Sequence, residues 1–174
     1  MIIPTWDLFI SLLFIVLVIY GLALGKERIL ALLISCYIGL IVSTVWGGAL
    51  YNFFTGQSSI SQEFWIKTNT SIFTIKTIVF TFIVLFLTIK GDFLKKAEAT
   101  YKGIFSIVIS GIYAFFSAGL ILTSLASFLP EAEKLSIIDQ SHIADLIIKY
   151  QTFWIVLPAL FMILFGFINK EEEE

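Results

Sequence analysis

The stretch LFISLLFIVLVIYGLAL, residues 8–24, is long and apolar enough to cross a membrane. Ser11, Tyr20 and Gly21 are the only residues in it that are not strongly apolar. An α-helix of ~17–25 apolar residues crosses a bilayer core, so the stretch predicts a transmembrane helix. Asp7 is the only charged side chain before it, whereas a signal peptide begins with basic residues. We therefore expect this helix to be retained in the membrane.

The remainder of the chain repeats this apolar pattern. Of its 174 residues, 59% are hydrophobic and 14% are charged, which indicates a membrane protein, because soluble domains are nearer ~45–50% and ~25%. The other apolar runs cover about 29–50, 72–89, 103–129 and 153–168. We predict an all-α, polytopic bundle of four to five transmembrane helices in one domain, 1–170, followed by a charged tail, 171–174. The last run is short and contains Pro158, so its full crossing of the membrane stays open.

Residues 136–150 form an amphipathic segment before the last apolar run. One helical face carries apolar side chains: Ile143, Leu146, Ile147 and Tyr150. The opposite face carries charged or titratable side chains: Asp139, His142, Asp145 and Lys149. This pattern predicts a helix that lies in the membrane interface with its polar face in water. A metal-binding or pH-sensing role for His142 is the alternative, but a lone histidine between two exposed acids makes a poor metal site.

Two turns carry the charges that orient the chain. The turns 25–28 and 90–102 together contain six Lys or Arg residues. Cytoplasmic loops of membrane proteins are enriched in these residues, so we predict that both turns are cytoplasmic and that the N-terminus is outside. Only four residues separate the first two apolar runs, so these helices are expected to be antiparallel neighbours. The loop 51–71 is polar and predicts a further short interfacial helix over 60–67.

Small residues recur at helical spacing in two of the apolar runs. In the second run they are Ser35, Gly39, Ser43 and Gly47. In the fourth they are Gly103, Ser106, Ser110, Gly111, Ala114 and Ala118. Small residues let membrane helices approach closely, which compensates for the missing hydrophobic drive between helices in lipid. Both runs are therefore predicted to be packing helices, inside the bundle or, alternatively, at a dimer seam.

Polar residues at three places are candidates for a functional role. The third run carries Thr74, Thr77 and Thr81 at spacings that keep one helical face. Such a stripe can line a water-filled path, although a threonine hydroxyl also bonds readily to its own backbone one turn earlier, which is the favoured interpretation. Lys76 lies near the end of this run and is expected to snorkel into the headgroups. Asp7 beside Trp6 is interpreted as an interfacial anchor or as a cap of its helix.

No catalytic, cofactor-binding or metal-binding motif is present in the sequence. There is no H-E-x-x-H, G-x-S-x-G or glycine-rich phosphate loop, so we expect no enzyme activity and no cofactor. The single cysteine, Cys36, lies in an apolar run and is predicted to be a packing residue. A net charge of −2 gives no indication of a nucleic-acid partner. The predicted partners are the lipid bilayer and a second copy or another membrane protein.

Three features of the sequence occur together: an acid at the start of the first helix, Asp7, a turn with Gly25 and Arg28, and small residues at Gly39 and Ser43 in the second helix. Small residues are also present at the start of the fourth helix. In these features the sequence resembles the colicin V production (CvpA) family of bacterial inner-membrane proteins. The resemblance implies a non-enzymatic accessory or scaffold protein that supports colicin V-type toxin production or export, or envelope homeostasis. Two alternatives remain: a small oligomeric channel or transporter subunit, and the membrane anchor of a larger complex.

Overall fold

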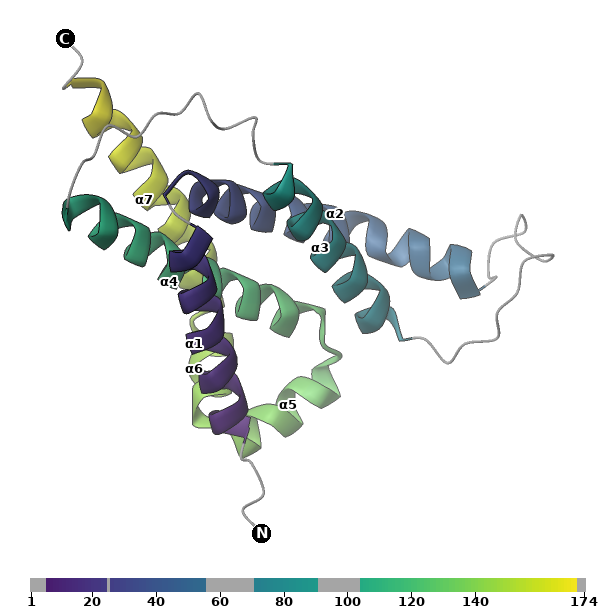
Figure 1. Cartoon of the computed structure of the whole chain (residues 1–174). Coiled ribbons are helices and arrows are strands. Elements are labelled where there is room, and N and C mark those ends of the chain that lie inside the picture. Colours follow the sequence, from purple (N-terminus) through teal and green to yellow (C-terminus); the bar gives the residue numbers. More distant parts are fainter. Residues whose placement is uncertain (1–5, 25, 56–70, 91–103, 172–174) are drawn as a thin grey trace.

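The computed structural model describes residues 6–24, 26–55, 71–90 and 104–171. The described residues are helical apart from short turns (Figure 1). These helices are α1 (Trp6–Leu24), α2 (Lys26–Thr55), α3 (Ile72–Ile89), α4 (Ile104–Phe128), α5 (Glu131–Gln140), α6 (His142–Lys149) and α7 (Gln151–Glu171). The predicted interfacial helix over 60–67 and most of the turn 90–102 lie outside the described residues.

Four of these helices, α1 to α4, are long and apolar enough to cross a membrane. The consecutive helices α6 and α7 meet at a bend of 59° and together count as a fifth candidate, either as a broken span or as a re-entrant segment. The predicted class, an all-α membrane bundle with four to five spans, is confirmed. The last apolar run, 153–168, lies within α7, and the bend places α6 at an angle to it.

The helix boundaries differ from the apolar runs mainly at polar ends. The third run, 72–89, coincides with α3, whereas α2 begins three residues earlier and ends five residues later than 29–50. Backbone hydrogen bonding continues a helix through polar side chains, so hydropathy marks the membrane-buried part and not the whole helix. The described part of α1 ends at Leu24 and that of α2 begins at Lys26.

The prediction of one amphipathic helix over residues 136–150 is wrong. The structure divides it between α5 and α6, and the backbone at Ser141 is extended, with φ −143° and ψ 116°. Ser141 ends α5 and caps α6, since its side chain accepts a hydrogen bond from the backbone N–H of Ala144. A serine favours such a cap because its hydroxyl competes for backbone groups that a continuing helix would use.

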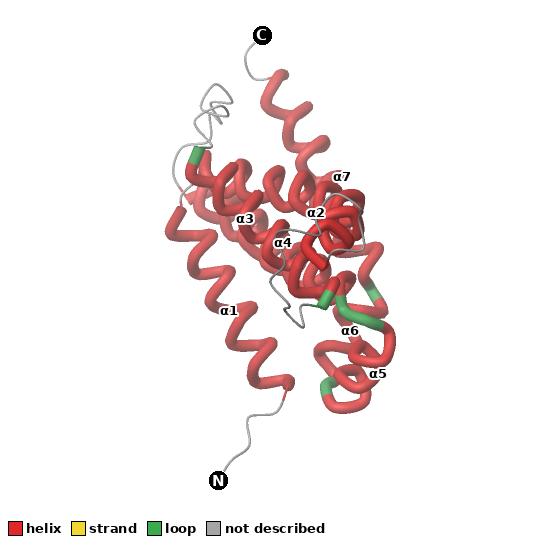
Figure 2. The backbone as a smooth tube through the Cα atoms, turned by 90° about the vertical axis from the view of Figure 1, so that its right-hand side faces the viewer, coloured by secondary structure: helices red, strands yellow, loops and turns green. Residues whose placement is uncertain are grey.

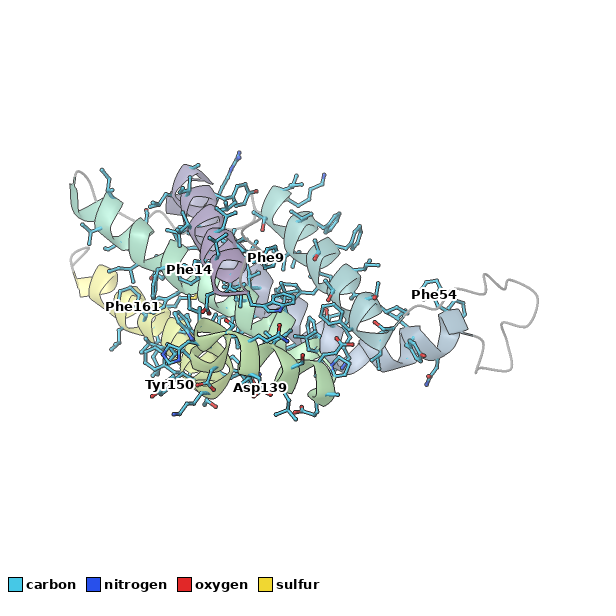
Figure 3. The ribbon with its side chains drawn as sticks, turned by 90° about the horizontal axis from the view of Figure 1, so that it is seen from below. Phe9, Phe14, Phe54, Asp139, Tyr150 and Phe161 are labelled. Atoms are coloured by element: carbon cyan, nitrogen blue, oxygen red, sulfur yellow. The ribbon has the colours of Figure 1, made fainter. Side chains whose placement is uncertain are left out.

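The bundle is held by close helix pairs, and α1 crosses over α4 (Figures 1 and 2). The most extensive pair is α2 on α3, and α1 packs on α4 while α4 packs on α7. The buried apolar cluster is drawn mostly from α2, α3 and α4: Ile29, Leu32, Leu33, Cys36, Phe80, Val84, Ile109, Tyr113, Ala114, Phe116, Leu120 and Phe128. In contrast, the end of α2 that carries Phe54 projects away from α1 and α7 (Figure 3).

Candidate functional site

A carboxylate at the start of α1 holds the start of α6. The Asp7 Oδ1 atom accepts a hydrogen bond of 2.6 Å from the Ser141 hydroxyl and one of 3.0 Å from the backbone N–H of Ile143. The Ser141 oxygen in turn accepts the backbone N–H of Ala144 at 3.0 Å. These residues form a chain of caps, which we call the Asp7–Ser141 tie.

The position of the tie has an electrostatic reason. Asp7 lies in the first turn of α1, and its oxygen reaches the first turn of α6. A helix N-terminus presents unpaired N–H groups and a partial positive charge, so two adjacent N-termini are both stabilised by one carboxylate between them. Asp7 was predicted to anchor with Trp6 or to cap its own helix. The Trp6 ring instead packs edge-on to Phe9, with 6.1 Å between the centroids.

An open groove of about 720 Å³ lies beside this tie, with walls from α1, α4, α6 and α7. We call it the apolar groove; its lining residues are Ile10, Ser11, Phe14, Ile15, Phe115, Ile143, Leu146, Ile147, Tyr150, Phe153 and Trp154. Phe115 joins two walls, because its ring centroid lies 5.3 Å from that of Phe14 and 5.3 Å from that of Trp154. A smaller cavity of about 150 Å³ lies between α1, α3, α4, α5 and α6. Ile10 and Ile147 line both spaces.

The predicted packing residues of α2 lie on the face that meets α3. Ser35, Gly39, Ser43 and Gly47 are buried. A Cβ atom on Gly39 would approach the Phe80 ring and Val84 to 3.1 Å, and one on Gly47 would clash with the Cγ atom of Lys76. The Lys76 stem therefore lies directly over α2, which is possible only because Gly47 has no side chain.

The predicted packing residues of α4 are divided between neighbours. Ser110, Ala114 and Ala118 are buried, whereas Gly111 is partly exposed. Gly103 and the Ser106 side chain lie outside the described part of the chain. Ala114 faces α1, since a Cβ on Gly21 would come within 2.9 Å of the Ala114 Cβ.

Two close contacts were missed by the sequence reasoning. Gly21 allows α1 to cross α4, and Gly119 receives the Trp154 ring of α7, which would clash with any Cβ there. Gly21 gave a signal, as a break in an otherwise aliphatic run, but Gly119 followed Ala118 without a regular spacing of its own. The partner of each glycine comes from a distant part of the chain, so no local pattern identifies it.

The threonine stripe of α3 is divided by the packing. Thr74 and Thr81 are exposed, and the Thr74 hydroxyl lies 3.0 Å from that of Ser71, the N-cap of α3. The Thr77 and Thr88 hydroxyl oxygens are buried without a hydrogen-bond partner among the described residues. The stripe therefore does not form one continuous polar line along the helix.

The remaining polar candidates lie at the surface. Arg28 and His142 are exposed, while Gly25 is not among the described residues. No group of three His, Cys, Asp or Glu side chains suited to a metal occurs in the described part of the chain. Lys149 does not pair with Asp145; its Nζ atom lies 6.0 Å from the centre of the Tyr150 ring.

No protein family profile, curated protein or solved structure matches this chain. The functional argument therefore depends on the geometry of the bundle.

Proposed function

We propose that the chain is an accessory or scaffold protein of the bacterial cytoplasmic membrane, similar to the colicin V production family. In this proposal it supports export of a colicin V-type peptide toxin or envelope homeostasis, and it performs no catalysis. The observation that carries the proposal is the Asp7–Ser141 tie. The acid at the start of the first helix, which is the first feature of the resemblance, is used to join two helices 134 residues apart in sequence.

Other polar groups in the bundle are used in the same structural way. The Tyr37 hydroxyl of α2 donates to the Ile155 carbonyl of α7 at 2.6 Å. The Ser35 and Ser124 hydroxyls donate to carbonyls one turn earlier in their own helices, at 2.6 and 2.7 Å. An unpaired polar group in hydrocarbon is costly, so these bonds favour a defined helix arrangement.

The outer surface of the bundle supports the same proposal. Large apolar side chains project outward from several helices, including Ile19, Val45, Phe82 and Leu164, each more than half exposed. Such faces are solvated by lipid or covered by another membrane protein, not by water. Such faces leave room for a membrane partner, which an accessory or scaffold protein requires.

Gene deletion and complementation test the proposal. Deletion in the source bacterium should lower secretion of a peptide toxin or activate the envelope stress response, and the wild-type gene should restore the original level. The Asp7→Ala variant, matched for membrane abundance, should restore it less well. Unchanged secretion and unchanged stress response after deletion would refute the proposal. Ion flux through the purified protein in liposomes would instead assign a channel, and a stoichiometric co-purifying enzyme would assign an anchor.

A further inference from the structure

We propose that the apolar groove binds an acyl chain of a membrane phospholipid, with the phosphate of that lipid next to Lys149. The proposal does not depend on the accessory function. It follows from three properties of the groove: the depth of its walls in the membrane, the chemistry of its lining and the charge at one end.

Two walls of the groove belong to candidate membrane spans. Four residues of α1 form one wall, namely Ile10, Ser11, Phe14 and Ile15, and Phe115 of α4 contributes to another. A groove at this depth opens toward lipid. Its volume of about 720 Å³ lies within the ~300–1,000 Å³ typical of small-ligand sites.

The lining of the groove selects hydrocarbon over water. Apart from the Ser11 and Tyr150 hydroxyls and the Trp154 indole N–H, the lining side chains carry no polar group. A bound water requires two to four polar partners, so this groove does not hold an ordered water chain. An empty groove would forfeit contacts along its aromatic walls, which a flexible acyl chain restores.

The charge at one end identifies a lipid in preference to an apolar helix. Tyr150 lines the groove, and the exposed Lys149 ammonium lies 6.0 Å from the centre of its ring. Because Lys149 has no ion pair within the described chain, its charge remains available to an anion. A phospholipid places a phosphate at the end of a long hydrocarbon chain, which matches this arrangement of apolar walls and a terminal cation.

Tryptophan quenching by brominated lipids tests the occupant directly. Trp154 lines the groove, so a protein with Trp6→Phe, Trp46→Phe and Trp65→Phe retains a single reporter there. Its emission should be strongly quenched in vesicles of phosphatidylcholine and phosphatidylglycerol with bromine on the acyl chains. The reference is the same protein in unbrominated vesicles. Bromine near the middle of the chain and bromine near the headgroup then report the depth of contact.

Two adjacent positions on α1 provide the matched variants. Ser11→Phe places a ring in the groove and should remove most of the quenching. Leu12→Phe adds a ring at a position that is 57% exposed and lines neither cavity, so quenching should be unchanged. Both proteins are compared at equal helicity by circular dichroism.

A headgroup measurement keeps the test decisive even if Ser11→Phe does not fold. In the single-tryptophan protein, Lys149→Gln should abolish the stronger quenching by brominated phosphatidylglycerol relative to brominated phosphatidylcholine. Absence of quenching before any of these changes would overturn the proposal, and a dimer in light scattering would then indicate a second copy in the groove. Equal quenching in the folded Ser11→Phe and Leu12→Phe proteins would also overturn it.

Discussion

At the scale of single residues, the molecule depends on a few polar and small side chains whose partners are distant in sequence. The Asp7 carboxylate accepts hydrogen bonds from the backbone at the start of α6 and from the hydroxyl of the buried Ser141. Gly47 and Gly119 have the opposite role, since they provide space for Lys76 and for the Trp154 ring. The contributions of the tie and of Gly119 to stability can be measured against control substitutions elsewhere in the bundle.

The first prediction concerns the Asp7–Ser141 tie. Ser141→Ala should lower the free energy of unfolding in detergent by about 1 kcal/mol, which is the typical loss for a helix cap. Asp7→Ala should also lower the thermal midpoint, and the double variant should be less destabilised than the sum, because both changes break one hydrogen-bond chain. Ser136→Ala is the control, because this exposed hydroxyl of α5 accepts a hydrogen bond from the Gln140 side chain of its own helix and takes no part in the tie. Strictly additive effects would contradict a shared tie.

The second prediction compares two glycines within helices. Gly119→Ala should destabilise the protein by ~1–3 kcal/mol, because the new Cβ must displace the Trp154 ring from a tight site. Gly48→Ala has no atom within 4 Å of the new Cβ and should leave stability unchanged or slightly raised. Thermal unfolding in detergent measures both, and in the Trp6→Phe, Trp46→Phe, Trp65→Phe background a change in Trp154 emission should accompany only the first. Equal behaviour of the two variants would mean that α4 and α7 are not in close contact.

At the scale of elements, short helices are where the fold differs most from the sequence pattern. Ile147 of α6 is buried as its pattern predicts, but Leu146 and Tyr150 are about half exposed and line the apolar groove. On the polar side, Asp139 and His142 are exposed. Asp139 and Tyr150 lie along the edge formed by α5 and the junction of α6 with α7 (Figure 3). The extended backbone at Ser141 changes the direction of the chain, so that α5 and α6 do not share one continuous helical face.

The third prediction concerns the immersion of α5 and α6. Spin labels placed singly along residues 135–150 should give a depth profile with a period of ~3.6 residues in each helix. Labels at Asp139 and His142 should be shallow, and one at Leu146 should be deep. The phase should shift at Ser141, because its extended backbone separates the helices. An uninterrupted oscillation across 141 would support one continuous helix, and a flat profile would exclude an interfacial position.

At the scale of the whole molecule, the predicted topology depends on charged residues at the ends of α2 and α3. Arg28 and Lys90 are both exposed, at the start of α2 and at the C-cap of α3. Helices α2 and α3 run antiparallel (Figure 1), so these two residues lie toward the same end of the pair. That both turns face one side of the membrane stays a prediction, and these two exposed residues are the positions at which it can be tested.

The fourth prediction is an outside N-terminus with both basic turns in the cytoplasm. Single cysteines at Arg28 and Lys90, introduced on a Cys36→Ala background, should resist an impermeant thiol reagent in intact cells and react after permeabilisation. The reason is the excess of Lys and Arg in these turns. Cys36 is fully buried, so its replacement removes a background thiol without exposing a new surface. Labelling of either position in intact cells would reverse the orientation.

The sequence by itself determined the helical membrane class, the place of most spans and the small-residue face of α2. Each of these is a local property, because run length and helical periodicity are defined within one segment. The tertiary structure alone decided that Asp7 caps α6, that 136–150 breaks at Ser141, and that Trp154 requires Gly119. The apolar groove is also visible only in the tertiary structure, because its walls come from four helices. These features depend on which distant helices meet, and a periodic small-residue face, as in α2, marks a contact without identifying its partner.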